Sequence, residues 1–204
     1  IPDLPSAPKC LFVVREPASQ IYSLFRYFQG NWDWIPAGLC FADYVEMLRR
    51  GEGEFRGNEL AENALGHARY VDYLTRWRAR LGPKRMMVLT FDTLLADHTA
   101  LTRRVAEWVG LDPAFYDTYA FARHNETYAP RSVWLQRINR QVRGVMPKGR
   151  SYDALRRAYR RLNTRKPGRP SDDDAQVLEE LRLEFAEPNA RLAAEFGLDL
   201  TGWG

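Results

Sequence analysis

Two residues near the start of the chain have the types and spacing of an anion-binding pair. Arg15 follows the apolar run Cys10–Val14, and Ser23 lies eight residues further on. A guanidinium offers five N–H donors in a fixed fork that fits phosphate or carboxylate, and a hydroxyl adds one more donor. The pair also has ordinary alternatives, because Arg15 could form an ion pair with Glu16 or Asp92, and Ser23 could be an exposed helix serine.

Positive charge is concentrated in one segment, residues 137–169. It holds twelve Lys or Arg residues and one acid, a net charge of +11; since the whole chain carries +4, the remainder carries −7. Within the segment, Gly149 separates Lys148 from Arg150, so the backbone can approach an anion that both cations contact. Tyr152 follows and could close over such an anion. A solvated arginine-rich helix face and an ordinary basic turn are the alternatives.

The histidines and cysteines show no metal-ligand spacing, so no metal is predicted. His124 lies in an aromatic stretch and is a candidate general base. His67 falls in a predicted helix and His98 near the start of another. The two cysteines are too few for a disulfide framework.

The first strand and helix position Arg15. The run Cys10–Val14 predicts a strand buried on both faces, as in a parallel sheet. Pro17 then opens a helix that ends at Gly30. Arg15 therefore falls at the carboxyl end of a parallel strand, where α/β sheets bind their ligands. Free N–H groups at the start of the helix are expected to add anion affinity.

The remaining pattern is mostly helical. We predict a second buried strand over Met86–Phe91 and helices over 41–50, 59–81, 99–109, 133–142 and 153–163, with a last helix that Ser171 caps. Pro188 is expected to kink or break that helix. Two strands make a small sheet, since about four to six are usual. The sequence therefore predicts a helix-rich α/β fold whose parallel sheet is incomplete in this chain.

An ordered set of motifs resembles the sulfotransferase family. The segment Phe12–Pro17 with Ser23 resembles the family's strand–loop–helix motif, with Glu16 where Asp is usual. Further resemblances follow in the family's order. Val88–Leu95 resembles the family's second strand, Val105–Asp112 resembles the end of a helix, and Asn125 with Pro130–Ser132 resembles a segment common in bacterial members. Pro147–Tyr152 resembles the Lys-Gly-Arg loop of the heparan-type branch, and Leu181–Asn189 with Leu192 and Trp203 resembles the C-terminal helix and its closing Trp.

This resemblance spans nearly the whole chain, and it implies both a fold and a ligand. The fold would be a P-loop-like parallel sheet flanked by helices. The co-substrate would be 3′-phosphoadenosine 5′-phosphosulfate (PAPS), without a metal. Arg15 and Ser23 would bind its 3′-phosphate, with Lys148, Gly149, Arg150 and Tyr152 folding over the same group.

The sequence departs from the family in one respect. Sulfotransferases bind the 5′-phosphosulfate with a Pro-Lys-X-Gly-Thr-Thr loop that precedes the Arg…Ser motif, and no such loop occurs here. We therefore expect residues 1–204 to form a single sulfotransferase-like domain that is N-terminally incomplete. The catalytic lysine and, by the same argument, the general base would lie outside this chain.

The predicted function is transfer of a sulfuryl group from PAPS to a hydroxyl or amine acceptor. Two alternatives stay open: a fragment of a nucleotide-dependent phosphotransferase, and a non-enzymatic polyanion or nucleic-acid binder that uses residues 137–169. No nucleic-acid motif is present, so no nucleic-acid partner is expected. The acceptor could be a carbohydrate, lipid, phenol or protein. No apolar run approaches the ~20 residues of a membrane span, and we expect a cytoplasmic location, or the Golgi lumen for a eukaryotic-type member.

Overall fold

The computed structural model describes residues 7–32, 34–121, 129–130, 164–165 and 170–203. The chain divides into two compact units: residues 1–120 together with 171–204, and residues 121–170. In the second unit, strand β3 (Ala129–Pro130) pairs antiparallel with β4 (Thr164–Arg165). The first unit holds all the elements described below. That residues 1–204 form one domain remains a prediction.

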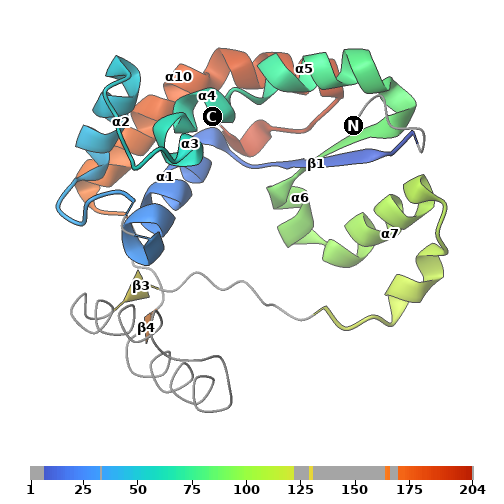
Figure 1. The fold of residues 1–204 in the computed structure, drawn as a ribbon. Coiled ribbons are helices and arrows are strands. Elements are labelled where there is room, and N and C mark those ends of the chain that lie inside the picture. Colours follow the sequence, from blue (N-terminus) through green and yellow to red (C-terminus); the bar gives the residue numbers. More distant parts are fainter. Residues whose placement is uncertain (1–6, 33, 122–128, 131–163, 166–169, 204) are drawn as a thin grey trace. The chain divides into compact units, whose positions relative to one another are not determined.

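The first unit is built on a small parallel sheet. Strand β1 (Cys10–Val14) pairs with β2 (Met86–Thr90), and Cys10 lies opposite Met86 and Val14 opposite Thr90. Helices flank the pair, so the predicted helix-rich α/β class with a parallel sheet is confirmed (Figure 1).

Strand β1 is covered on one face and exposed on the other. Val14 belongs to a buried cluster, and the partly buried Cys10 and Phe12 pack against it, with the ring of Phe12 lying 5.7 Å from that of Trp77. Leu11 and Val13, which point the other way, are 43% and 49% exposed. The prediction of burial on both faces is therefore wrong for β1, because the described residues supply cover on one face alone.

Helix α1 (Pro17–Tyr27) follows β1 directly and continues into one π-helical turn, η1 (Phe28–Trp32). Proline suits the first helical position because it has no N–H to leave unpaired. Ile21 and Phe25, one turn apart, are buried on the inner face of α1. Helix α2 (Phe41–Arg50) comes next and ends at Gly51, whose φ of +67° favours glycine.

The predicted helix over residues 59–81 is three helices: α3 (Glu59–Glu62), α4 (Ala64–Ala68) and α5 (Tyr70–Leu81). The breaks fall at Asn63 and Arg69, whose backbone angles are not helical. The side chain of Asn63 lies where a Cβ on Gly66 would stand, at 2.2 Å from its Oδ1. Glycine at position 66 therefore accommodates the turn that separates α3 from α4.

After the turn η2 (Pro83–Arg85) and strand β2, helices α6 (Phe91–Ala96) and α7 (His98–Val109) lead to η3 (Pro113–Asp117). Helix α10 (Asp172–Phe196) and η4 (Thr201–Trp203) close the unit. Ser171 caps α10 as predicted, with its Oγ accepting from the Asp174 N–H at 3.1 Å. Pro188 lies inside α10 without ending it, so the predicted break is wrong, whereas the kink stays a prediction. Buried residues on both sides, Phe185 and Leu192, hold the helix in place.

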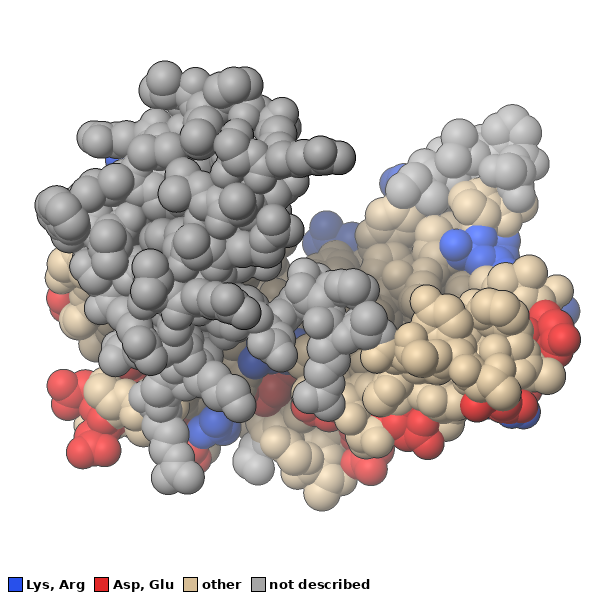
Figure 2. All heavy atoms as spheres, turned by 90° about the horizontal axis from the view of Figure 1, so that it is seen from below, with Lys and Arg blue, Asp and Glu red and all other residues tan. Residues whose placement is uncertain are grey.

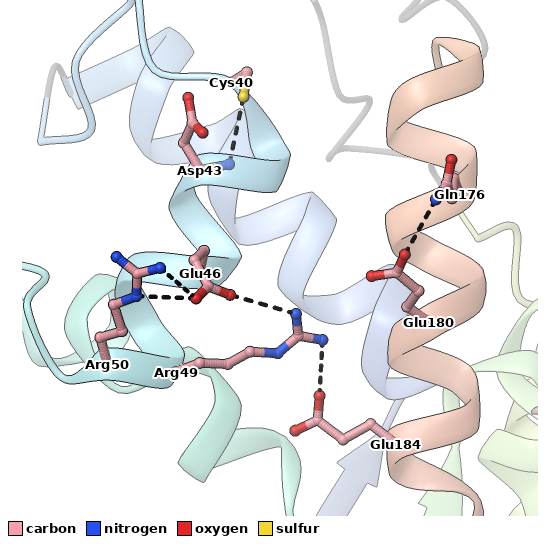
Figure 3. A network of polar contacts seen from close by, with 8 residues as sticks. All are labelled: Cys40, Asp43, Glu46, Arg49, Arg50, Gln176, Glu180 and Glu184. Carbon is pink, nitrogen blue, oxygen red and sulfur yellow. Dashed lines mark hydrogen bonds and ion pairs between the residues drawn. The ribbon is translucent and has the colours of Figure 1, made fainter.

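Helix α10 joins two apolar clusters. Its first half packs with α1 and α2 in a cluster that includes Phe25, Phe41 and Phe185. Its second half packs with β1, β2 and α5 in a cluster that includes Leu74 and Leu192. On the surface, Arg49 of α2 reaches Glu184 of α10 at 3.0 Å (Figure 3). Burial of apolar surface, rather than such exposed ion pairs, dominates the stability of this arrangement.

Candidate anion-binding site at the end of strand β1

Arg15 is the first residue beyond β1, and Phe91 is the first residue beyond β2. Because the strands are parallel and Val14 lies opposite Thr90, the two residues that follow come together at the same edge of the sheet. The Arg15 guanidinium carbon lies 5.4 Å from the centroid of the Phe91 ring. This cation–π contact holds the guanidinium plane while its N–H edges remain able to bind an anion.

The two acids that could neutralise Arg15 are engaged elsewhere. The carboxylate of Glu16 accepts from the N–H groups of Ala18 and Ser19, each at 2.8 Å. The carboxylate of Asp92 accepts from the indole N–H of Trp203 at 2.8 Å. Within the described residues, Arg15 forms no ion pair. Its positive charge is therefore available to a ligand.

The start of helix α1 does not offer the free N–H groups that we predicted. Pro17 has no N–H, and Glu16 takes the N–H groups of Ala18 and Ser19 with its carboxylate. The Gln20 N–H donates to the carbonyl of Glu16 at 2.9 Å. Glu16 thus accepts every N–H of the first turn, two with its carboxylate and one with its carbonyl, so anion affinity at this edge must come from side chains.

Ser23 lies on α1 six residues after Pro17, about 9 Å along the helix axis. Its side chain is partly exposed, and its hydroxyl forms no hydrogen bond with any residue that the structure describes. The hydroxyl is therefore available, like Arg15. A ligand that contacted both residues would lie along the first two turns of α1.

Sequence reasoning missed two aromatic residues beside Arg15. Phe91 supplies the ring under the guanidinium. Tyr70 is 6% exposed, its ring lies 6.4 Å from that of Trp203, and the charges of Arg15 and Glu16 act on its hydroxyl. Burial raises the pKa of Tyr70 above its ordinary value, so the phenol stays protonated to a higher pH than an exposed tyrosine would. The signal for Phe91 was its place directly after a strand; nothing in the sequence marked Tyr70.

Several predicted site residues lie outside the described residues: Lys148, Gly149, Arg150, Tyr152 and His124. Most of the basic segment 137–169 lies there too. The part of the chain that the structure does describe carries both signs of charge on the face drawn in Figure 2.

The two histidines that the structure describes lie on separate helices. His67, on α4, lies 3.5 Å from Glu59, and His98 opens α7. Cys10 and Cys40 are not bridged. Among the described residues, no cluster of His, Cys, Asp and Glu has a metal-binding arrangement. No helix in this part of the chain is long and apolar enough to cross a membrane.

Comparisons with known proteins place the fold. No protein-family model matches the chain, and no curated protein sequence matches it. Among solved structures, it is similar to a sulfotransferase from Alicyclobacillus acidocaldarius, with a TM-score of 0.56 and 16% sequence identity. The match covers 96% of this chain and 57% of the bacterial one, so the chain spans little more than half the length of that neighbour. The fold that carries Arg15 is thus an α/β fold of the sulfotransferase kind.

Proposed function

We propose that the protein is a sulfotransferase that moves a sulfuryl group from PAPS to a hydroxyl or amine acceptor. The observation that carries the proposal is Arg15, which lies at the carboxyl end of β1 without an acidic partner among the described residues. The likeness of the fold to a solved sulfotransferase supports it, and so does the motif order in the sequence.

In this proposal Arg15 binds the 3′-phosphate of the donor and Ser23 donates its hydroxyl to the same group. A guanidinium–phosphate contact is charge-assisted and can be bidentate, which fixes orientation as well as affinity. The resemblance assigns Lys148, Gly149, Arg150 and Tyr152 to the same phosphate. All of these residues would set the affinity and register of the donor, and none of them would act on the bond that breaks.

The reaction itself is an in-line displacement. The acceptor oxygen or nitrogen attacks sulfur, the bond from sulfur to the 5′-phosphate oxygen breaks, and adenosine 3′,5′-bisphosphate leaves. A general base takes the acceptor proton, and His124 is a candidate for that role. Catalysis would rest on positioning and on neutralising the charge of the leaving group. No Pro-Lys-X-Gly-Thr-Thr loop occurs in the sequence, so we assign the charge neutralisation at the 5′ end to no residue of this chain.

A second candidate function rests on the charge distribution. Residues 137–169 carry +11 against −7 for the rest of the chain, which would attract nucleic acid or another polyanion. Such binding would weaken steeply as salt rises, because it depends on counterion release. A nucleotide-dependent phosphotransferase is the third reading, since an arginine at the end of a strand would suit its phosphates equally.

Thermal unfolding in the presence of ligands separates the three readings. Sulfotransferase function predicts a rise in Tm with adenosine 3′,5′-bisphosphate and a smaller one with ATP. Under the phosphotransferase reading, ATP would give the larger rise. Stabilisation by a DNA oligonucleotide that disappears with added salt, without a response to either nucleotide, would favour the polyanion binder. The acceptor and the cellular location remain predictions from the sequence.

A further inference from the structure

A cavity lies along β2, toward the end of the sheet opposite Arg15. It has a volume of about 320 Å³ and is lined by the first three residues of β2, Met86, Met87 and Val88. Met86 and Met87 point to opposite faces of the sheet, and no residue of β1 lines the cavity. The cavity therefore opens at the edge of β2 that faces away from β1. Arg15, Ser23 and Phe91 do not line this cavity, so it is separate from the residues of the proposed donor site.

Helices from both sides of the sheet form its apolar walls. Trp108 of α7 lies on one side and Phe196, the last residue of α10, on the other, while Pro83 lies at the end next to β2. In Figure 1, α5 and α7 appear on either side of the sheet. The indole of Trp108 is held by its N–H, which donates to the Lys84 carbonyl at 3.2 Å. Its volume is that of a small-molecule site, and its lining is mixed, with apolar side chains and the three charged residues Arg78, Arg104 and Glu195.

Two guanidinium groups give the cavity a positive charge. Arg78 lies 5.4 Å from the Phe196 ring and donates to the backbone carbonyl of Glu195. Arg104 is exposed, and no ion pair involves it in the part of the chain that the structure describes. The one acid in the lining, Glu195, accepts a hydrogen bond from the Thr75 hydroxyl at 2.9 Å. The lining therefore carries more positive than negative charge, and Arg104 is available to an anionic group.

We propose that this cavity binds a small amphipathic anion. The apolar, aromatic body of such a ligand would lie against the side chains of Trp108 and Phe196, whose rings also contact Lys9 and Arg78. Its carboxylate or sulfonate would face Arg104, which is the cation without a partner among the described residues. Such a ligand would bind independently of the donor nucleotide, because the two sites lie at opposite ends of the strands.

The test uses naphthalene-1-sulfonate as the probe and the indole N–H signal of Trp108 in a ¹⁵N-labelled protein as the readout. Trp108→Phe identifies that signal among the six tryptophans. We expect the probe to shift the Trp108 signal saturably, and neutral naphthylmethanol to bind more weakly. Arg104→Gln should weaken probe binding about tenfold, or about 1.4 kcal/mol.

A matched control separates a specific contact from general attraction. Arg76→Gln removes one exposed positive charge from α5 at a position that does not line the cavity. It should leave probe affinity unchanged. Three results would overturn the proposal: no saturable shift of the Trp108 signal, equal shifts of all the indole signals, or the same affinity in both arginine variants. None of them bears on adenosine 3′,5′-bisphosphate binding, so failure here leaves the proposed function standing.

Discussion

Glu16 holds the turn between β1 and α1, and its loss should cost more stability than the loss of an exposed acid. Its carboxylate accepts from the N–H groups of Ala18 and Ser19, each at 2.8 Å, and Glu16 is itself 8% exposed. The change Glu16→Ala removes both bonds at once. Pro17 has no N–H, so it loses no hydrogen bond. The Gln20 N–H still donates to the carbonyl of residue 16.

The cost follows from where the two donors lie. Loss of an N-cap side chain typically costs about 1 kcal/mol, and a buried donor left without a partner costs about 1–3 kcal/mol. Ala18 is 0% exposed, so water cannot replace its lost partner, whereas Ser19 is partly exposed and can be hydrated. We therefore expect Glu16→Ala to lower the free energy of unfolding by about 2–3 kcal/mol. Glu16→Asp, which keeps a carboxylate, should cost less than about 1 kcal/mol.

Urea denaturation followed by circular dichroism measures this loss. The matched control is Glu46→Ala on α2, where the carboxylate lies 2.9 Å from Arg50 and 3.9 Å from Arg49 on the surface (Figure 3). Exposed ion pairs contribute about 0.2–1 kcal/mol, so this variant should lose little. If the two alanine variants lost the same free energy, the account of the β1–α1 turn would be refuted.

Three further predictions concern the packing around the site. Phe185→Ala, at a residue that is 0% exposed where α10 packs on α1, should cost about 3–5 kcal/mol in urea unfolding; a loss below about 1 kcal/mol would contradict the packing. Trp203→Phe keeps an aromatic ring but removes the N–H that donates to Asp92 and part of a side chain that is 3% exposed, so it should lower stability by at least about 1 kcal/mol, whereas an unchanged Tm would count against that bond. Burial raises the pKa of Tyr44 and Tyr70 above 10 in the folded state. Above pH 10 the unfolded chain therefore holds fewer protons, and stability falls as pH rises, by about 1.4 kcal/mol per pH unit for each tyrosine. Tyr44→Phe should reduce the slope of unfolding free energy against pH by the contribution of one tyrosine. An unaltered slope would refute the raised pKa of Tyr44.

The sequence predicted the elements whose signals are local. Both strands appear where apolar runs stand before Arg15 and Phe91, and α1 begins at its proline. Gly110 ends α7 with a φ of +90°, as expected for a glycine C-cap. Each of these features can be predicted because it depends on local sequence rather than on tertiary contacts.

Tertiary contacts decided the elements that the sequence did not predict. The break at Asn63 lies where its side chain packs against Gly66, and α10 continues through Pro188 with buried residues on both sides of it. The preference of proline against helix interiors is outweighed there by packing. The sequence also did not predict the exposure of Leu11 and Val13, because a run of apolar residues does not show whether one or both faces of the strand are covered.

The candidate site was predicted in part. Arg15 follows from the strand–loop–helix pattern, and the structure adds that Phe91 lies beside it and that neither Glu16 nor Asp92 pairs with it. The place of Phe91 depends on parallel pairing across 76 residues, since Val14 lies opposite Thr90. The roles of Ser23, Lys148, Gly149, Arg150 and Tyr152 remain predictions.

The central claim is that Arg15 binds the 3′-phosphate of a nucleotide donor, and calorimetry on two ligands and two proteins tests it most directly. Adenosine 3′,5′-bisphosphate and adenosine 5′-monophosphate differ by that phosphate alone. In the unmodified protein we expect its removal to weaken binding at least tenfold, about 1.4 kcal/mol, as for loss of a charge-assisted contact. In Arg15→Gln, the two ligands should bind with nearly equal, weak affinity. An undiminished preference for the bisphosphate in Arg15→Gln would contradict the claim.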